Sequence, residues 1–379
     1  MFRTFGPFSV YLINMVASIT SVKNLRGKVV LLRSDLNVET TKDSFKLSRA
    51  LPTIQYLKKK GAITLVMSHR GRPEGVDMKQ SLKFLVPYLS RKVGKVSFVP
   101  SHGQDELYGA IGKAKAGDVL LLENLRFHEG EDACDPQWAA LLASGAHVYV
   151  NDAFPSHHEG ATVSILPRLL PAYIGLQMAA EVAALSKVMK SPKKPLVVIL
   201  AGGKATDKFA VIKYLHNKTK TFLIGGVLAN TFFKAMGIDI DSSVVDDEIL
   251  AEVKKVLHDK KLVLPMDWIS DGGGKILDLG SLSAEKFGKV IAEAGTVIWN
   301  GPMGFFEDKR FKAGSVAIAK AVAKSKAFSV VGGGETTSLI VDLGLEKKID
   351  FLSTGGGAML AFLAGKPHAG LEALGYKNK

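Results

Sequence analysis

The stretch of sequence that decides the fold lies at residues 196–204 and reads LVVILAGGK. Five consecutive apolar residues, Leu196 to Leu200, are typical of a strand buried on both faces of a parallel sheet. The glycines that follow let the backbone approach a ligand closely, and a helix beginning after them would present unpaired N–H groups and a positive dipole end. This segment therefore predicts a strand–loop–helix unit that binds an anion.

Two further glycine clusters repeat this arrangement in the second half of the chain. They read GGGET at residues 332–336 and GGG at residues 355–357, and each follows an apolar run. One cluster alone would be weak support, because paired glycines also form ordinary tight turns. Three clusters, with Lys204 and Lys208 beside the first and the Glu335 carboxylate inside the second, favour a nucleotide polyphosphate bound with a metal ion.

Short β-branched runs alternate with helical stretches along the whole chain, which is the pattern of parallel sheets covered by helices on both faces. Strands are expected at 29–32, 63–66, 119–122, 148–150, 196–200, 221–224, 262–264, 297–299 and 329–331. Helices are expected at 51–57 and 81–85. The fold class is therefore α/β, with two Rossmann-like domains, each a parallel sheet flanked by helices, joined by an interdomain helix and hinge.

The length of 379 residues also indicates two domains, because it exceeds what one hydrophobic core usually organises. An apolar helix at 175–190, ended by two closely spaced prolines, is the expected interdomain helix. We expect an N-terminal domain at 15–174 and a C-terminal nucleotide-binding domain at 191–365, with residues 366–379 packing back on the first. The glycine run at 355–357 is the expected hinge, which would let the domains close during catalysis.

Composition limits the partners and the compartment. The formal net charge of +14 suits an anionic ligand, but there is no long basic block, RNA-binding aromatic motif or zinc spacing, so small anionic substrates are favoured and no nucleic acid is expected. The single cysteine, Cys134, excludes an internal disulfide and is typical of a reducing compartment. No segment is long and apolar enough for a membrane helix, so we expect a cytoplasmic monomer without a membrane partner. Residues 1–14 form an extension of unknown role, with Met15 as an alternative start.

Polar segments follow the four strands expected in the first half, where ligands of open α/β sheets bind. These segments read RSDLN at 33–37, SHRGRP at 68–73, ENLRFH at 123–128 and NDAFPSHH at 151–158. Any one of them could be a structural salt bridge or a turn. Four together, holding His69, Arg72, Arg126 and His157, predict a cationic pocket for phosphate and carboxylate groups.

On these motifs the chain resembles the phosphoglycerate kinase family. The segments that carry the resemblance are LLRSDLNV (31–38), SHRGRP (68–73), ENLRF (123–127), VNDAF (150–154), GGKATDK (202–208), WNGPMGFFE (299–307), GGGET (332–336) and STGGGA (353–358). The resemblance implies a kinase of glycolysis and gluconeogenesis. Such an enzyme transfers phosphoryl reversibly from 1,3-bisphosphoglycerate to ADP, giving 3-phosphoglycerate and ATP, with Mg²⁺ as the cofactor of ADP and ATP.

The same resemblance implies which residues form the site. The substrate-binding residues would be Asp35, Leu36, Asn37, Lys46, His69, Arg70, Gly71, Arg72, Arg126, His157 and His158. The nucleotide-binding residues would be Gly202, Gly203, Lys204, Lys208, Gly225, Gly226, Asn300, Glu307, Gly333, Gly334, Glu335 and Thr336. The catalytic residues would be Lys204, Arg72, Lys46, Gly332 and Gly333. Lys204 would follow the transferring phosphoryl group, Glu307 would face the ribose, and Glu335 would ligate the magnesium ion.

Three departures from the family pattern bear on activity. Lys46 stands where the family usually has arginine, and lysine lacks the bidentate fork. The segment after Phe154 lacks the usual arginine, with His158 in its place, and Glu335 stands where aspartate is usual. An alternative is therefore a divergent member that binds nucleotide with weak or no kinase activity, as a scaffold or partner protein, and another is a kinase for a different acyl phosphate. We expect the working phosphoglycerate kinase, because most of the charged site residues persist.

Overall fold

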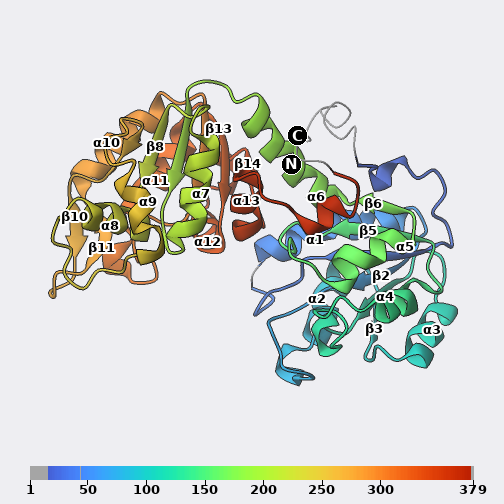
Figure 1. The fold of residues 1–379 in the computed structure, drawn as a ribbon. Coiled ribbons are helices and arrows are strands. Elements are labelled where there is room, and N and C mark those ends of the chain that lie inside the picture. Colours follow the sequence, from blue (N-terminus) through green and yellow to red (C-terminus); the bar gives the residue numbers. More distant parts are fainter. Residues whose placement is uncertain (1–15, 43, 377–379) are drawn as a thin grey trace. The chain divides into compact units, whose positions relative to one another are not determined.

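The structure is a computed structural model that describes residues 16–42 and 44–376. The chain forms two compact α/β units (Figure 1). Unit 1 contains the described residues up to Ala183 together with the segment from Pro367, and unit 2 is Ala184–Lys366. The chain thus passes into unit 2 within the helix expected between the domains. The expected extension at residues 1–14 and the alternative start at Met15 lie outside the described residues.

Unit 1 is built on a six-stranded parallel sheet with the order β3-β4-β2-β1-β5-β6. The strands are β1 (Val29–Ser34), β2 (Ile63–Met67), β3 (Val96–Val99), β4 (Val119–Leu122), β5 (Val148–Asp152) and β6 (Ala172–Ile174). Every side chain of β1, β2, β4 and β5 is buried, so the expectation of strands covered on both faces is confirmed. Strands β3 and β6 were not expected, because exposed Ser97 interrupts the apolar run of β3 and β6 has only three residues.

Helices cover both faces of this sheet and enclose two apolar cores, one containing Leu47, Ile54 and Leu89 and the other containing Leu107 and Trp138. The helices are α1 (Ser44–Lys59), α2 (Val86–Val93), α3 (Gln104–Lys113), α4 (Pro136–Ala143), α5 (Leu166–Leu169) and α14 (Ala369–Glu372), with 3₁₀ turns at Ile19–Ser21, Met78–Gln80, Lys83–Leu85 and Leu125–Phe127 and a π turn at Ala161–Ile165.

The expected helix at 51–57 is confirmed as part of α1. The one at 81–85 is wrong, because the Ser81 hydroxyl bonds Glu123 and only a short 3₁₀ turn follows before α2.

Unit 2 has a second six-stranded parallel sheet with the order β14-β13-β12-β7-β8-β9, and a separate antiparallel pair, β10-β11. The strands are β7 (Leu196–Leu200), β8 (Thr221–Ile224), β9 (Leu262–Val263), β10 (Trp268–Ser270), β11 (Ile276–Leu279), β12 (Thr296–Asn300), β13 (Phe328–Gly332) and β14 (Phe351–Leu352). The helices are α6 (Leu176–Lys190, which starts in unit 1), α7 (Ala205–Leu215), α8 (Gly226–Ala235), α9 (Leu250–Lys254), α10 (Ser281–Ala292), α11 (Ala313–Lys324), α12 (Gly334–Asp342) and α13 (Gly356–Leu363), with 3₁₀ turns at Asp247–Ile249, Lys309–Phe311 and Glu346–Lys348.

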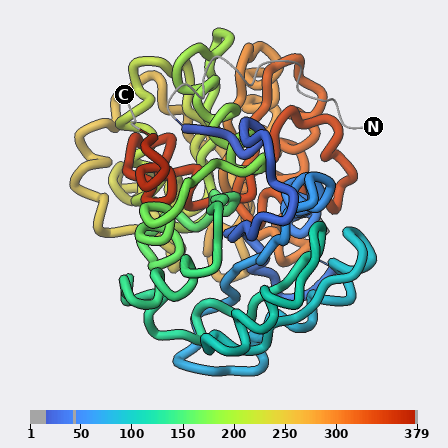
Figure 2. Tube along the Cα trace, turned by 90° about the vertical axis from the view of Figure 1, so that its right-hand side faces the viewer, coloured from blue at the N-terminus to red at the C-terminus, as the bar shows by residue number. Residues whose placement is uncertain are grey.

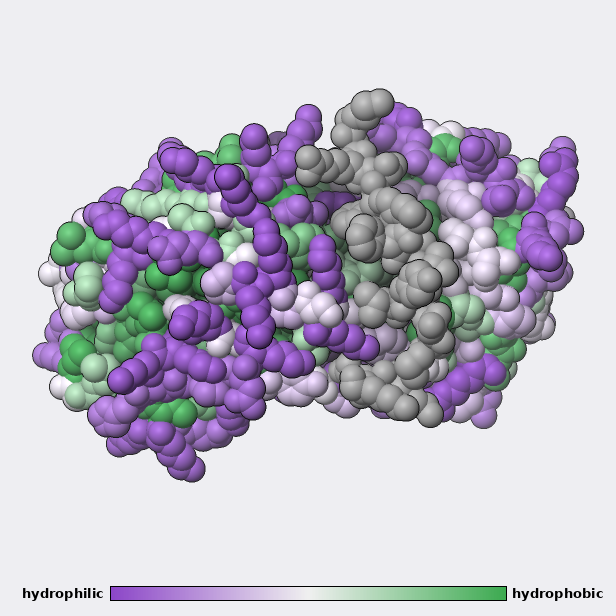
Figure 3. Space-filling view, turned by 90° about the horizontal axis from the view of Figure 1, so that it is seen from above, coloured by the Kyte–Doolittle hydropathy of each residue, from purple (hydrophilic) through white to green (hydrophobic). Residues whose placement is uncertain are grey.

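Hydrophilic residues cover much of the face seen in Figure 3, on both units. Within the described part of the chain, no helix is long and apolar enough to cross a membrane.

The segment after Lys366 returns to unit 1 and packs beside the loop that follows β5 (Figure 2). His368 is 4% exposed, and its Nε2 donates to the Phe154 carbonyl at 2.9 Å while its Nδ1 accepts from the Leu371 N–H at 3.3 Å. Burial lowers the pKa of His368 to about 4, so the ring is neutral at ordinary pH. The return segment therefore completes unit 1 with a buried, neutral histidine.

The first turn of α6 is anchored on unit 1 by two buried polar side chains. Asp152 Oδ1 accepts from the Met178 N–H at 3.0 Å, and Thr53 Oγ1 accepts from the Leu176 N–H at 3.0 Å. Asp152 is 3% exposed, and burial raises its pKa from 3.8 to about 7. The folded protein thus holds this proton more tightly than the unfolded chain does.

We expect Asp152→Asn to change how stability depends on pH. Because the folded-state pKa is raised, the parent protein loses the contribution of this group as the pH rises from 3.8 to about 7, whereas asparagine does not titrate. The melting temperature of the variant minus that of the parent should therefore increase between about pH 4.5 and about pH 8 in thermal unfolding. A difference that stays constant over this range would contradict the assignment.

Candidate active site

The glycine clusters of unit 2 meet at the carboxyl ends of neighbouring strands, and they contact one another backbone to backbone. A Cβ atom on Gly226 would lie 2.4 Å from the backbone nitrogen of Gly202, and one on Gly356 would lie 2.9 Å from the Cα of Gly333. A Cβ atom on Gly301 would lie 1.8 Å from a carbonyl oxygen of the segment after β7. No side chain fits at these positions, so this part of the site consists of backbone atoms. We call the surface formed by Gly202, Gly226, Gly301, Gly333 and Gly356 the glycine floor.

Four helices begin directly at this glycine floor. They are α7, α8, α12 and α13, and none of the four has a side-chain cap on its first turn. Their unpaired N–H groups and positive dipole ends attract phosphate oxygens. Thr336 Oγ1 accepts from the Gly301 N–H at 2.9 Å, and Asn300 Nδ2 donates to the Gly356 carbonyl at 3.5 Å, so the loops are also tied together. The arrangement is suited to a polyphosphate.

The two lysines of the first cluster have different surroundings. Lys204 precedes α7, is exposed, and has a positive φ of 50°. Lys208 is 4% exposed and donates to the carbonyls of Gly203 and Lys204. Burial lowers the pKa of Lys208 to about 8. Lys208 therefore bonds to the backbone of the loop in this structure, while Lys204 is accessible to a ligand. The phosphate contact of Lys208 that the resemblance implies stays a prediction.

A cavity of about 440 Å³ opens beside the glycine floor, which is the size of a small-molecule site. Six of the expected nucleotide residues line it: Gly202, Gly203, Gly225, Gly226, Glu307 and Glu335. The remaining expected residues of unit 2 belong to the floor and the helix starts rather than to the cavity wall.

The apolar part of the cavity was missed by sequence reasoning. Its walls include Ala229, Phe233, Val244, Trp268 and Met303. These residues come from α8, β10 and two loops and form no motif, so only the fold brings them together. Apolar walls of this kind accept the flat face of an aromatic ring.

The carboxylates of Glu335 and Glu307 both line the cavity beside the glycine floor. The pKa of Glu335 is raised by burial and, to a smaller extent, by the charge of Glu307. Among residues 16–42 and 44–376, no group of three or more His, Cys, Asp or Glu side chains could hold a metal ion. Mg²⁺ usually keeps several waters and is bound by one or two carboxylates plus substrate phosphates, so these two residues fit a magnesium ion that arrives with a nucleotide.

In unit 1, the centre of the candidate site is a buried pair of Arg33 and His69. Arg33 is 2% exposed, and its Nη2 lies 2.7 Å from Nδ1 of His69, while its Nε donates to Thr162 Oγ1 at 3.2 Å. Thr162 Oγ1 donates in turn to the buried Glu131 at 2.6 Å. Because arginine stays protonated, Nδ1 of His69 must accept, which leaves Nε2–H as a donor. Burial, followed by the charge of Arg33, holds the pKa of His69 well below its usual value.

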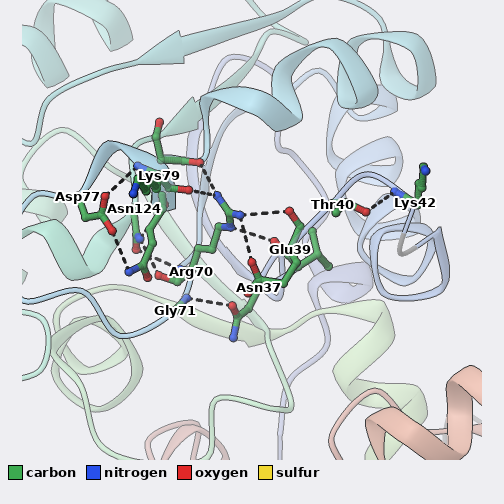
Figure 4. Close-up of polar contacts among 12 residues, drawn as sticks. Asn37, Glu39, Thr40, Lys42, Arg70, Gly71, Asp77, Lys79 and Asn124 are labelled. Carbon is green, nitrogen blue, oxygen red and sulfur yellow. Dashed lines mark hydrogen bonds and ion pairs between the residues drawn. The ribbon is translucent and has the colours of Figure 1, made fainter. Parts of the chain in front are cut away.

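The loops after β1, β2 and β4 are tied together by asparagine side chains (Figure 4). Asn37 Oδ1 accepts from the Gly71 N–H at 3.1 Å. Asn124 Oδ1 accepts from the N–H groups of Arg70 and Arg126, each at 3.1 Å, and its Nδ2 donates to the Arg70 carbonyl at 2.8 Å. These bonds bring the expected residues of the first three loops into one cluster. Neither Arg33 nor Asn124 was expected there, although both lie within the polar segments that follow strands.

Arg70 requires a correction, because its guanidinium is used within the protein (Figure 4). Nε donates to the Val38 carbonyl at 3.0 Å, Nη1 to the Lys79 carbonyl at 2.6 Å, and Nη2 to the Glu39 carbonyl at 3.1 Å. The guanidinium also lies 4.5 Å from the centroid of the Phe84 ring. The expected substrate contact is therefore replaced by a structural role in which Arg70 fixes the loop after β2.

Three other cations act on His69 electrostatically. The positive charges of Arg126, Lys46 and Arg72 each help to lower its pKa, after burial and the charge of Arg33. Arg72 is exposed, and Lys46 is half-buried with its Nζ 3.4 Å from the Asn37 carbonyl oxygen. Arg126 Nη1 donates to the Gly71 carbonyl at 2.6 Å. These positive groups form a cationic cluster near the carboxyl end of the sheet, and its use as a pocket for the substrate stays a prediction.

The loop after β5 joins this cluster through Ser156, whose Oγ accepts from Arg33 at 3.3 Å. The rings of His157 and His158 lie 3.9 Å apart, and the His157 carbonyl accepts from the Ala369 N–H at 3.1 Å. The return segment therefore supports the loop that carries both expected histidines.

Two parallel sheets, one ending in a glycine floor beside a cavity and the other in a cationic cluster, define a two-unit α/β protein built for phosphorylated ligands. The family profile described as phosphoglycerate kinase matches residues 19–366. The chain is 39% identical over 375 residues to a phosphoglycerate kinase of Aquifex aeolicus, covering 90% of this chain and 94% of that protein.

Solved structures give the same result. The chain superposes on phosphoglycerate kinase from Coxiella burnetii with a TM-score of 0.82 at 32% identity, covering 95% of this chain and 98% of that one. On phosphoglycerate kinase from Pyrococcus horikoshii OT3 the TM-score is 0.85 at 28% identity, with 94% and 98% covered. The chain belongs to the phosphoglycerate kinase family, which confirms the resemblance and the two-sheet α/β fold class.

Proposed function

We propose that the protein transfers phosphoryl reversibly from 1,3-bisphosphoglycerate to ADP, giving 3-phosphoglycerate and ATP, with Mg²⁺ accompanying the nucleotide. The observation that carries this proposal is the glycine floor, where four helices begin beside a cavity of about 440 Å³. A cytoplasmic monomer working in glycolysis on small molecules is part of the proposal, and the family membership supports it.

On the nucleotide side, transfer requires alignment and positive charge around the moving group more than a general base. The helix starts at Gly334 and Gly356 would orient phosphate oxygens through backbone N–H groups. Lys204, which is exposed beside them, would follow the charge of the transferring phosphoryl. When bound, Mg²⁺ would neutralise charge between neighbouring phosphates, and Glu335 would hold it.

On the glycerate side, a neutral His69 would donate from Nε2 to a substrate oxygen, because Arg33 occupies Nδ1. Arg72 and Arg126 would supply the positive charge for the phosphate and carboxylate of the substrate. Asp35 and Asn37 would bind its hydroxyl group. Arg33 acts here as a positioning residue, since it fixes the tautomer and orientation of His69.

A coupled assay of ATP formation from 1,3-bisphosphoglycerate and ADP tests the proposal directly, and calorimetric titration with 3-phosphoglycerate and with ADP tests the two sides separately. Turnover with both ligands bound is the expected result. ADP binding without 3-phosphoglycerate binding or turnover would instead support a nucleotide-binding scaffold protein. Turnover only with another acyl phosphate would support a kinase for that different substrate.

We expect Lys46→Arg to raise kcat/KM for the glycerate substrate about tenfold. Lys46 lies in the cationic cluster, and a bidentate hydrogen bond from arginine would stabilise the bound group by roughly 1 to 2 kcal/mol. The matched control is Lys59→Arg at the far end of α1, which should change nothing. An unchanged or lower kcat/KM for Lys46→Arg would mean that the pocket is shaped around lysine.

A further inference from the structure

Nine cationic side chains gather at the amino-terminal edge of the unit 1 sheet, which is the edge opposite the candidate site. They are Arg26, Lys28, Lys58, Lys59, Lys60, Arg91, Lys92, Lys95 and Lys115, and we call them the basic edge. Seven of them are exposed, and Lys28 and Lys58 are half-buried. No stretch of sequence shows this cluster, because it is divided among four short segments.

The sheet topology brings these segments together. Each segment contains a glycine with positive φ, namely Gly27, Gly61, Gly94 and Gly117, and each leads directly into one of the strands β1 to β4. These four strands are adjacent in the order β3-β4-β2-β1, so the turns stand in a row about 14 Å long at the usual strand spacing. The basic edge is therefore a product of the fold.

Contacts between neighbouring turns confirm that they form one surface. The Gly27 N–H donates to the Gly61 carbonyl at 2.9 Å, and the Gly117 N–H donates to the Ala62 carbonyl at 3.2 Å. A Cβ atom on Gly94 would lie only 2.8 Å from Nζ of Lys58. The turns that carry the cations thus contact one another.

The charge of the basic edge is not neutralised within the protein. In the described parts of the chain, none of the nine cations lies within ion-pair distance of a carboxylate. The four segments contain a single acid, Asp118, whose Oδ2 accepts from the Lys115 backbone N–H at 2.9 Å. Clustered like charges repel one another, and a polyanion that releases its own counterions into solvent would relieve that repulsion.

We propose that the basic edge binds the phosphodiester backbone of single-stranded RNA, without sequence preference. A flexible strand can follow a row of turns and place roughly five phosphates against the cations. Tyr56 and Tyr88 lie beneath Lys60 and Lys92 and are not exposed for base stacking, so the bases are not read. The sequence expectation of no nucleic acid partner rested on the absence of a basic block, which the fold supplies.

Membrane lipid is a weaker match for the same charge. Peripheral membrane surfaces combine basic residues with apolar side chains that enter the bilayer. The exposed large apolar side chains of the described residues, such as Val76, Leu169 and Trp268, all lie outside the four segments of the basic edge. The surface offers charge alone, which suits a nucleic acid backbone.

The test is fluorescence anisotropy of a labelled 20-nucleotide oligouridine RNA with the full-length protein. We expect a Kd on the order of 1 µM at about 50 mM salt and a loss of about 100-fold at about 200 mM salt, because roughly five phosphate contacts give a slope of about −3.5 in log K against log salt. Binding that is undetectable, or that does not depend on salt, overturns the proposal.

A charge-matched pair of variants locates the surface. The triple variant Lys59→Glu, Lys92→Glu, Lys95→Glu should lose at least about tenfold in affinity and have a salt slope shallower by about 2. The control triple variant Lys254→Glu, Lys255→Glu, Lys260→Glu changes three exposed lysines of unit 2 by the same total charge and should stay within about threefold of the parent protein. Equal losses in both triple variants would show a general charge effect and overturn the proposal.

Two further measurements complete the design. Turnover and melting temperature of both triple variants should match the parent protein, and the three Lys→Gln changes replace the reversals if the first variant fails to fold. Vesicles of phosphatidylcholine with about 30% phosphatidylserine provide the comparison with lipid. Tight vesicle binding that depends on the basic edge, in the absence of RNA binding, would assign the surface to a membrane and contradict the proposal.

Discussion

Lys204→Ala is expected to lower kcat by at least about 100-fold while ADP affinity falls by less than about tenfold. Removing one preorganised group that stabilises developing charge costs about 3 to 4 kcal/mol in the transition state, and much less in the bound ground state. Lys204 is exposed at the start of α7, beside the glycine floor, where such a charge can follow the phosphoryl group. Steady-state kinetics and ADP titration measure the two effects separately.

The backbone at Lys204 supplies the control for this prediction. Its φ of 50° carries the same left-handed strain for alanine as for lysine, so Lys204→Ala removes the charge and leaves the strain unchanged, whereas Lys204→Gly removes both. Both variants should lose kcat equally, and Lys204→Arg should retain part of it. Near-normal turnover of Lys204→Ala, or a Lys204→Gly variant that is far more active, would show that the ammonium group is not the cause.

Gly226→Ala is expected to weaken ADP binding by at least about tenfold. At this position φ is 55°, and the added Cβ would lie 2.4 Å from the nitrogen of Gly202 and 2.8 Å from its carbonyl oxygen. These are backbone atoms, which cannot relieve an overlap by changing rotamer as a side chain can. The loop after β7 must therefore move, and the glycine floor changes shape. Titration with ADP measures the loss.

The matched control is Gly237→Ala, at the other end of α8. Gly237 has a φ of 75°, but no atom lies within 4 Å of the Cβ that alanine would add, so this change carries the same left-handed strain of about 1 to 2 kcal/mol without the steric overlap. It should lower the melting temperature slightly and leave ADP affinity unchanged. Equal losses of affinity in both variants would mean that backbone strain, and not the contact with Gly202, determines the effect.

The two parallel sheets could be predicted from the sequence because their central strands are continuous apolar runs. Strand β3 could not, since exposed Ser97 breaks its pattern, and neither could β10 and β11, whose pairing is antiparallel and lies apart from the main sheets. The order of the strands is also absent from the sequence. The strand order depends on which face of the sheet each connecting segment crosses, and no local sequence pattern determines that.

The sequence predicts which loops form the candidate site, but not the role of each side chain in those loops. Arg70 has the right residue type in the right loop, yet its donors bond to three backbone carbonyls. These bonds join segments distant in sequence, which no local pattern determines. Gly356, one of the glycines expected to form the hinge, starts α13, and a Cβ atom on it would lie 2.9 Å from the Cα of Gly333. The hinge itself stays a prediction. Domain closure during catalysis stays a prediction.

The return segment described above also bears on how the protein is made. Unit 2 is one continuous stretch, Ala184–Lys366, so its whole sequence is synthesised before His368 is added. Unit 1 begins first, but the loop after β5 lacks the His368 contact with the Phe154 carbonyl until the chain has been synthesised past unit 2. Although domains generally fold in the order in which they are translated, here the earlier unit is the last to be finished. A nascent chain released just after Lys366 would therefore carry the complete sequence of unit 2 and an unfinished unit 1.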